Sequence, residues 1–311
     1  VSPVFNLLTS TLDDNRKENR YLQLMNEEEA IAQVQKHLGR KGIADISPIA
    51  QKVKQDTITM HRNLVLIFME SMSAQLMQAF GQSKILTPYL DSLYHESLSF
   101  NNIYSAGIHT NHGLYSTLYS FPTIMKRNAM KGSVIPIYSG LPTVLKDNGY
   151  HNLFFMTHES QYDNMNAFFR TNGFDEIYAE ENYPKEKIVN HFGVQDDYLY
   201  EYALPILTQR ANEGKPFFAT LLSISNHPPY IIPEYFHPRS EKTEDQIVEY
   251  ADWSIRKFMS EAQKQPWFDN TLFVFVGDHG KLEETPEKEM PESDNHIPLL
   301  IYGKGIQNKK K

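Results

Sequence analysis

An aspartate and a histidine stand side by side directly after an apolar run near the end of the sequence. Residues 271–277 read TLFVFVG, and Asp278 and His279 follow. In an open α/β sheet, reactive side chains gather at the carboxyl ends of strands, where loops carry them above the sheet. A carboxylate and an imidazole placed there suit a metal ion, although an isolated Asp-His pair is also compatible with a plain turn.

A third potential ligand follows another apolar run. Residues 63–69 read NLVLIFM and lead into Glu70. Glu70, Asp278 and His279 form a set of oxygen and nitrogen donors that suits zinc or manganese, and the carboxylates favour the harder ion. Such a metal site lowers the pKa of a nucleophile and neutralises charge on a phosphate or similar oxyanion. The alternative is that Glu70 only caps a helix that follows it.

The segment SAGIHTNHGLYSTL supplies a candidate nucleophile. Thr110 begins a predicted helix in this segment, after a loop that contains a glycine. A helix N-terminus favours both an ionised hydroxyl and a bound anion. The same segment also offers His109, His112, Ser116 and Thr117, and each of these residues can be purely structural.

Further histidines and a lysine are candidates for contact with the substrate. His227 lies just past a predicted strand and His296 just before one, and either can bind metal, hold a phosphoryl oxygen or protonate a leaving group. A histidine such as His227 can equally be satisfied by the backbone. His109 and His112 flank Thr110, and Lys281 follows the Asp-His pair, so these three residues are also substrate-binding candidates.

The candidates require a sheet whose strands end on one side. Five apolar runs of strand length alternate with helical patterns, and their continuous hydrophobicity is typical of strands covered on both faces. The predicted fold is therefore α/β, with a mostly parallel central sheet and helices on both faces. The predicted strands are residues 63–69, 151–157, 216–224, 271–277 and 297–303. The predicted helices are residues 110–120, 141–148, 195–212 and 244–264, and another helix begins at Thr87 as N-cap and Pro88.

Residues 1–60 differ in character from the rest of the chain. They are rich in charged, helix-favouring residues, and Gly39 and Gly42 are typical of a helix end. We expect a helical lead-in or juxtamembrane segment over residues 1–60 and a catalytic domain over residues 61–311. Asp252, inside the predicted helix 244–264, is expected to stabilise its own helix.

Composition excludes several function classes. The formal net charge of -8 argues against a nucleic-acid partner, because such surfaces usually cluster Lys and Arg. The chain has no cysteine, which excludes thiolate metal sites, disulfides and cysteine nucleophiles. No run approaches the roughly 18 apolar residues that a membrane-spanning helix needs.

A set of motifs, in order along residues 63–305, resembles a known family. The motifs are LVLIFMES, LTPYLDSL, HTNHGLYSTL, FGVQDDYLYEYAL, SNHPPY, DNTLFVFVGDHGK and NHIPLLIYG. Together they resemble the extracellular catalytic domain of the lipoteichoic acid synthase family, phosphoglycerol transferases of the alkaline phosphatase and sulfatase superfamily. The resemblance implies an alkaline phosphatase/sulfatase-like fold.

The resemblance also implies a mechanism. Glu70, Thr110, Asp278 and His279 would hold one divalent metal, usually Mn2+ in this family with Zn2+ or Mg2+ as alternatives, and His227 would lie beside the substrate head group. Thr110 would attack a phospholipid donor, form a phospho-threonine intermediate and pass the group to a glycan or lipid acceptor. The full-length protein would be anchored in the cell membrane, with this domain on the extracytoplasmic side.

The sequence departs from the family pattern in two places. The family's Trp-x-Arg element, which grips phosphoglycerol, is replaced by HESQYDNMNAFFRTNGFDE, in which Arg170 is displaced toward a helix end. The chain also stops soon after LLIYGKGI, so we interpret it as a C-terminally shortened fragment of a longer protein.

Several functions on the same fold remain alternatives. These are phosphoethanolamine transfer, hydrolysis of phosphodiesters or phosphomonoesters, and a non-catalytic lipid- or glycan-binding role. Sulfatase activity is disfavoured, because that branch needs a C/S-x-P-x-R sequence and HTNHGL does not provide one.

Overall fold

The computed structural model describes residues 4–5, 8–9, 12, 25–39, 42, 61–120, 128–131, 134–281 and 294–311. The chain divides into two compact units, residues 1–60 and residues 61–311. In the first unit, helix α3 spans Glu27–His37, and the Asn26 side chain caps it by accepting a hydrogen bond from the Glu29 N–H. The helix ends shortly before Gly39, whose φ is +63°. The rest of the expected helical lead-in lies largely outside the described residues.

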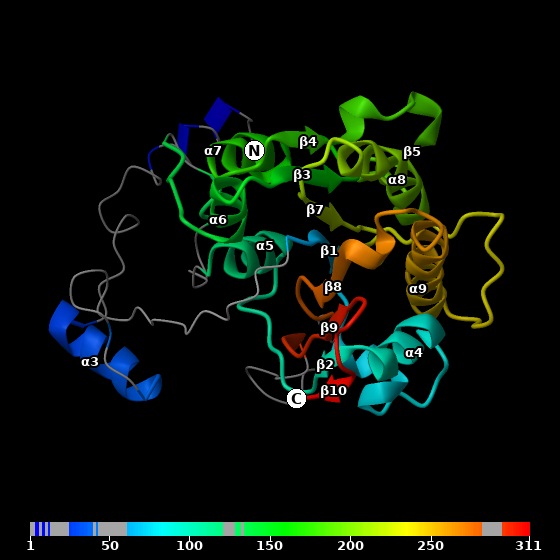
Figure 1. The fold of residues 1–311 in the computed structure, drawn as a ribbon, viewed down its shortest axis with the longest axis horizontal. Helices are drawn as coiled ribbons and strands as arrows, with labels where there is room; N and C mark the ends of the chain where they lie inside the picture. Colours follow the sequence, from blue (N-terminus) through cyan, green and yellow to red (C-terminus); the bar gives the residue numbers. More distant parts are fainter. Residues whose placement is uncertain are drawn as a thin grey trace. The chain divides into compact units, whose positions relative to one another are not determined.

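The second unit is built on an eight-stranded sheet with the order β10-β2-β9-β8-β1-β7-β3-β4. Five neighbouring strands, β8, β1, β7, β3 and β4, run parallel, and β9 runs antiparallel to both of its neighbours. The strands are β1 (Asn63–Met69), β2 (Leu98–Phe100), β3 (His151–Met156), β4 (Glu176–Tyr178), β7 (Phe217–Leu222), β8 (Thr271–Gly277), β9 (Leu299–Tyr302) and β10 (Lys309–Lys310). The predicted α/β fold with a mostly parallel sheet is confirmed (Figure 1).

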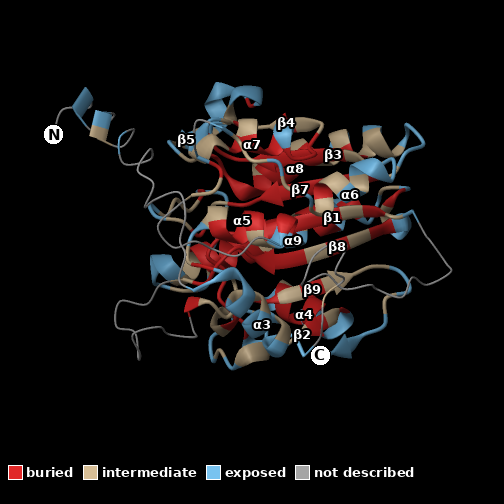
Figure 2. Ribbon diagram, turned by 90° about the vertical axis from the view of Figure 1, so that its left-hand side faces the viewer, coloured by how far each residue is buried: buried red, intermediate tan, exposed pale blue. Residues whose placement is uncertain are grey.

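Helices cover both faces of this sheet, because successive strand residues point to opposite sides and both sides are apolar. Val65 and Ile67 belong to one core cluster, with residues of α4, α8 and α9. Leu66 and Phe68 belong to the other, with residues of α5, α6 and α7. The helices are α4 (Pro88–Glu96), α5 (Thr110–Tyr119), α6 (Leu141–Asp147), α7 (Met165–Thr171), α8 (Asp196–Ala211) and α9 (Thr243–Ala262). Figure 2 shows the strands as the buried centre of this layered arrangement.

Short elements complete the second unit. A small hairpin-like pair is formed by β5 (Ile188–Asn190) and β6 (Gly193–Val194). Single 3₁₀ turns occur at Ala74–Leu76, Gln78–Phe80, Tyr162–Asn164, Glu180–Asn182, Lys185–Lys187 and Phe268–Asn270. Among the described residues, no helix combines the length and the apolar character that crossing a membrane requires.

The start of α4 agrees with one prediction and corrects another. Thr87 is the N-cap residue and the helix begins at Pro88, as predicted, but the Thr87 side chain makes no capping hydrogen bond and donates instead to Asp91 Oδ2 at 3.0 Å. The first N–H groups of α4, from Tyr89 and Leu90, donate to the two carboxylate oxygens of Asp252 at 3.0 and 2.8 Å. Asp252 therefore stabilises a neighbouring helix rather than its own, because α9 packs against α4 at this point.

Candidate active site

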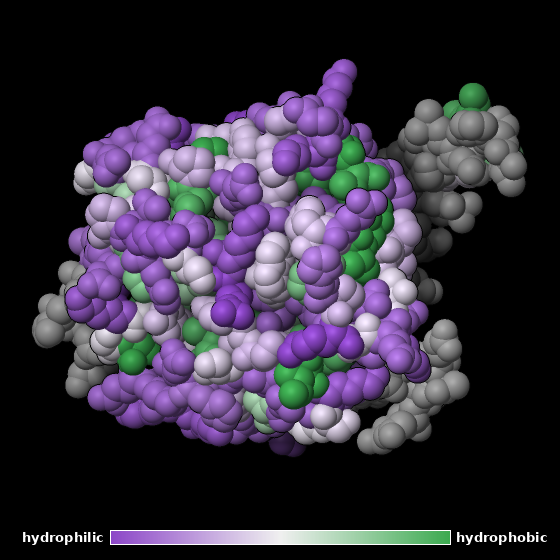
Figure 3. Space-filling view, turned by 90° about the vertical axis from the view of Figure 1, so that its right-hand side faces the viewer, coloured by the Kyte–Doolittle hydropathy of each residue, from purple (hydrophilic) through white to green (hydrophobic). Residues whose placement is uncertain are grey.

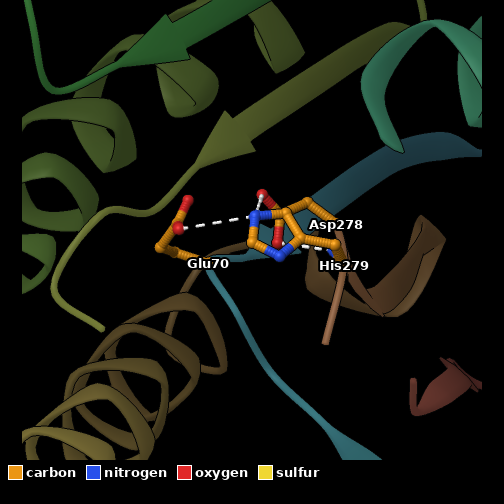
Figure 4. Close-up of side chains that lie close together, drawn as sticks. All are labelled: Glu70, Asp278 and His279. Carbon is orange, nitrogen blue, oxygen red and sulfur yellow. Dashed lines mark hydrogen bonds and ion pairs between the residues drawn. The ribbon is translucent and has the colours of Figure 1, made fainter. Parts of the chain in front are cut away.

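Strand pairing brings the first two candidate ligands together. β1 and β8 are adjacent and parallel, and Met69 pairs with Gly277 at their carboxyl ends. The next residue of each strand, Glu70 and Asp278, therefore emerges at the same point of the sheet edge, and His279 follows. Figure 4 shows the three side chains converging above the ends of these strands.

The three side chains form a compact, buried cluster. One ligand atom from each of Glu70, Asp278 and His279 lies within 4.8 Å of the other two. The His279 Nε2 atom is 3.7 Å from Glu70 Oε1 and 3.5 Å from Asp278 Oδ2. Glu70 is 1% exposed and Asp278 is 0% exposed. Two carboxylates are thus held in contact where water does not screen their charges.

The electrostatics of the cluster fit a cation. Burial, and secondly the negative charge of Asp278, raise the pKa of Glu70 well above its ordinary value. Asp278 Oδ2 is buried and accepts no hydrogen bond from the described residues. A buried oxygen without a donor is costly, and a divalent cation would satisfy it and neutralise the two carboxylates. The donor set of two carboxylates and an imidazole suits manganese or zinc.

Thr110 lies at this cluster as the first residue of α5. Its hydroxyl is 3.3 Å from Glu70 Oε2, to which it donates a hydrogen bond. A close approach of backbones holds it there: a Cβ built on Gly113 would lie 2.1 Å from the carbonyl oxygen of Asp278. Only glycine allows α5 to rest directly on the end of β8, so Gly113 positions Thr110 beside the carboxylates.

The end of β7 supplies the opposite side of the site. Asp196, buried at the start of α8, accepts hydrogen bonds from the N–H groups of Ile224 and Ser225 at 2.8 and 3.1 Å. The Asn226 side chain donates to the Ser71 carbonyl at 3.1 Å. These contacts fix the turn after β7 against the end of β1, and His227 follows immediately.

A pocket of about 520 Å³ opens over Thr110. The predicted site residues His109, Thr110, His227, His279 and Lys281 all line it. The His227 Nδ1 atom lies 2.6 Å from the Pro228 carbonyl oxygen, so Nδ1 carries the proton of this hydrogen bond and Nε2 remains for other partners. The Lys281 ammonium lies 4.8 Å from the centre of the Tyr230 ring.

Three other sequence candidates lie elsewhere. His112 is buried and does not line the pocket, and burial, together with His109 and His279, lowers its pKa. His296 is not among the lining residues, and its Nε2 lies 2.7 Å from the Asn101 carbonyl oxygen while its ring stacks on Tyr104. Arg170 is exposed on α7, where Nε donates to Asn166 Oδ1 at 2.9 Å.

The pocket also contains residues that sequence reasoning missed. Tyr162 and Asp163 line it, and Asp163 is held by the Asn111 amide at 3.0 Å and by Lys131 at 2.5 Å. Asp163 and Asn164 have φ values of 51° and 63°, a left-handed pair that non-glycine residues rarely adopt. These residues lie in the stretch that departs from the Trp-x-Arg pattern. That departure was the one feature of the sequence that pointed to this stretch as part of the substrate pocket.

Comparisons with known proteins agree with this arrangement. A model of the sulfatase family matches residues 62–311. The chain is 23% identical over 291 residues to lipoteichoic acid synthase 2 of Bacillus subtilis, a match that covers 80% of this chain and 42% of the relative. It is 23% identical over 299 residues to phosphoglycerol transferase I of Shigella flexneri, covering 90% of this chain and 39% of that protein.

A solved structure shares the fold. A protein of the alkaline phosphatase superfamily from Vibrio parahaemolyticus superimposes with a TM-score of 0.80 and 29% identity, covering 92% of this chain and 71% of that one. The chain spans about 40% of the length of the two curated relatives, at 42% and 39%.

Proposed function

The chain belongs to the sulfatase family, and from this membership and the site geometry we propose that it is a metal-dependent transferase. It moves phosphoglycerol, or a related phospho-alcohol, from a membrane phospholipid to a glycan or lipid acceptor. The names of the two curated relatives, a lipoteichoic acid synthase and a phosphoglycerol transferase, support this reaction class.

One observation carries the proposal. The Thr110 hydroxyl lies at a helix start, lines the pocket and donates to Glu70 of the carboxylate–imidazole cluster. A hydroxyl in this position has the two neighbours that a nucleophile needs, an anionic acceptor for its proton and a pocket for the substrate. No other hydroxyl-bearing residue proposed as nucleophile, neither Ser116 nor Thr117, lines the pocket.

The metal would be held by Glu70, Asp278 and His279 together with Thr110. Enzymes of this superfamily depend on metal ions, and Mn2+ is our first choice, with Zn2+ or Mg2+ as alternatives. A bound divalent cation would lower the pKa of a coordinated hydroxyl and neutralise phosphate charge.

In the first half-reaction, the Thr110 hydroxyl proton passes to Glu70, to which the hydroxyl is hydrogen-bonded. The Thr110 oxygen forms a bond to phosphorus, and the bond from phosphorus to the lipid alcohol breaks. The product is a phosphodiester of Thr110. The departing alkoxide needs a proton, and the Nε2 atom of a protonated His227 supplies it, since Nδ1 is committed to the Pro228 carbonyl.

In the second half-reaction, an acceptor hydroxyl attacks the same phosphorus and Thr110 leaves. The neutral His227 takes the proton of the attacking alcohol, and Glu70 returns its proton to the departing Thr110 oxygen. Thr110, His227 and Glu70 thus return to their starting states. Water in place of the acceptor would give hydrolysis, so acceptor binding decides between a transferase and a hydrolase.

Side chains other than the family's arginine recognise the head group of the phospholipid donor. Arg170 is held on α7 by Asn166, whereas Lys281 lines the pocket and presents an ammonium group. We assign to Lys281 the contact with a phosphoryl oxygen. Asp163 also lines the pocket, and a carboxylate there keeps phosphoethanolamine transfer as the second candidate function.

We further propose that residues 1–60 link this domain to a membrane anchor and that the domain works on the extracytoplasmic side. A phospholipid donor requires a catalytic domain at the membrane surface, and the acceptor is then a component of the cell envelope.

Substitution of Thr110 tests the proposal. In the presence of Mn2+ and phosphatidylglycerol vesicles, Thr110→Ala should lower release of diacylglycerol by about a thousandfold or more, because the nucleophile is removed. Thr110→Ser should retain measurable turnover. Thr117→Ala, an exposed position on the same helix, is the matched control and should keep wild-type turnover. Normal turnover by Thr110→Ala would exclude the mechanism.

A further inference from the structure

A second pocket, with a volume of about 470 Å³, lies between the start of α4, residues 236–239 and the middle of α9. It shares no lining residue with the pocket over Thr110. It therefore lies outside the machinery assigned so far, and its lining residues indicate what it holds.

Aromatic rings form the walls of this second pocket. Tyr89, Phe236 and Trp253 all line it, and the ring centres of Phe236 and Trp253 lie 5.5 Å apart. Aromatic faces favour ligands that present C–H groups, as aliphatic chains and sugar rings do.

Charged groups of both signs line the same pocket. Asp252 and Glu249 are 2% and 4% exposed, while Arg239 and Arg256 are exposed. Burial and the nearby Asp91 raise the pKa of Asp252 to about 7, and perturbed groups of this kind mark candidate ligand sites.

This combination distinguishes between ligand classes. An acyl chain would cover the exposed guanidinium groups of Arg239 and Arg256 with hydrocarbon, which is costly for charged groups, and an inorganic anion would face two carboxylates. A sugar has apolar C–H faces for the rings and hydroxyl groups that both donate and accept, so it matches carboxylates and guanidinium groups together. Figure 3 views the molecule from the side on which α9 lies in Figure 1, and this surface is mainly hydrophilic with small separate apolar patches.

The two pockets are joined by one stretch of chain, residues 227–239. His227 and Tyr230 line the pocket over Thr110, and Phe236 and Arg239 line the second pocket. Phe236 lies six positions after Tyr230, so the Cα atoms of these two residues are at most roughly 22 Å apart.

The connecting stretch is held in place at its far end. The Tyr235 hydroxyl donates to Asp197 Oδ1 at 2.8 Å, and the Arg239 N–H donates to Glu249 Oε2 at 2.7 Å. The Arg239 guanidinium also donates to the Ile85 carbonyl at 2.8 Å. These contacts give the second pocket a preformed shape.

We propose that the second pocket binds a neutral sugar unit of a glycan acceptor. This inference rests on the proposed function, because it assumes a reaction that has an acceptor. It specifies that this acceptor is a glycan rather than a lipid. A glycan that occupies the second pocket would extend along residues 227–239 toward Thr110 and present a hydroxyl group there.

Direct binding tests this inference without turnover, donor or metal, so its failure is separable from failure of the proposed function. The chain has two tryptophans, and Trp267 is buried in the core, so Trp253 fluorescence reports on the pocket. Neutral oligosaccharides of glucose, galactose and N-acetylglucosamine are titrated, with glycerol 1-phosphate as an anionic probe. At least one oligosaccharide should change the fluorescence saturably, and glycerol 1-phosphate should not.

A pair of variants locates the site. Arg256→Gln should weaken oligosaccharide binding by about tenfold, because a charged hydrogen-bond donor is lost, as measured by isothermal titration calorimetry. Lys264→Gln, just beyond the end of α9 and outside the pocket, should bind as the wild type does. The inference is overturned if no oligosaccharide binds, if Arg256→Gln binds normally, or if glycerol 1-phosphate alone perturbs Trp253.

Discussion

At the scale of single residues, Asp278 divides two tasks between its carboxylate oxygens. Oδ1 accepts hydrogen bonds from the N–H groups of Ser71 and His279 at 2.9 and 2.7 Å, which fixes the side chain and ties β1 to β8. Oδ2 has no donor among the described residues. A fixed carboxylate with one free, buried oxygen is preorganised for a cation, since no rearrangement precedes binding.

Metal binding should therefore stabilise the fold through Asp278. Mn2+ at about 100 times its Kd should add about 2.7 kcal/mol, which raises the Tm of a domain of this size by roughly 5–10 °C in differential scanning fluorimetry. Asp278→Asn should lose most of this shift. Asp269→Asn, at an exposed position paired with Lys304, is the control and should keep it. An undiminished shift in Asp278→Asn would show that the metal binds elsewhere.

A residue of the site could be predicted from the sequence where a recognisable strand or helix boundary lies next to it. Glu70, Asp278 and His279 follow apolar runs of strand length, and Thr110 follows a loop at a helix start. Asp163 carries no such mark, because its place in the pocket depends on a left-handed backbone and on contacts from Asn111 and Lys131. His296 was predicted as a site residue because of its place beside a strand, but its Nε2 atom is hydrogen-bonded to a backbone carbonyl instead.

At the scale of elements, the contact of α5 with the end of β8 determines where Thr110, the proposed nucleophile, lies. The helix contributes Thr110 at its first residue, and Gly113 one turn later rests on the Asp278 carbonyl. The distance from Thr110 to the carboxylates thus depends on a backbone contact rather than on side-chain packing.

Replacing Gly113 should disturb this contact. In Gly113→Ala the new Cβ meets the Asp278 backbone at 2.1 Å, so α5 must shift. We expect a loss of about 1–3 kcal/mol in the free energy of unfolding and at least tenfold lower turnover, because displacement of a reacting group by about 1 Å is costly. Denaturant unfolding and diacylglycerol release measure the two effects. An active Gly113→Ala enzyme with unchanged stability would contradict this account of α5, and Thr117→Ala is again the control.

The elements themselves were predictable where the pattern is long. The seven-residue, mostly apolar runs of β1 and of β8 gave the strand bounds directly. β2 and β4 were missed, because strands of three residues show no periodicity, and β2 is defined by pairing with β9, which is distant in sequence. The capping of α4 by Asp252 was also missed, because its partners lie 162 and 163 residues away in sequence.

At the scale of the whole catalytic unit, the parallel sheet assembles a site from distant parts of the chain. Glu70 and Asp278 directly follow β1 and β8, two strands that are far apart in sequence and adjacent in space. β7, the other neighbour of β1, ends in the turn that carries His227. The ends of β8, β1 and β7 and the start of α5 thus surround one pocket, in keeping with the position of ligand sites in open α/β sheets.

The central claim is that this pocket transfers a phospho-alcohol through Thr110. The most direct test is mass spectrometry of the protein after incubation with Mn2+ and phosphatidylglycerol, without acceptor, followed by rapid acid quenching. Trypsin cleavage after Lys84 and Lys126 gives a peptide that contains Thr110. The account predicts a mass gain of one phosphoglyceryl group, located on Thr110. Release of diacylglycerol with the label on another residue, or with no covalent label at all, would contradict it.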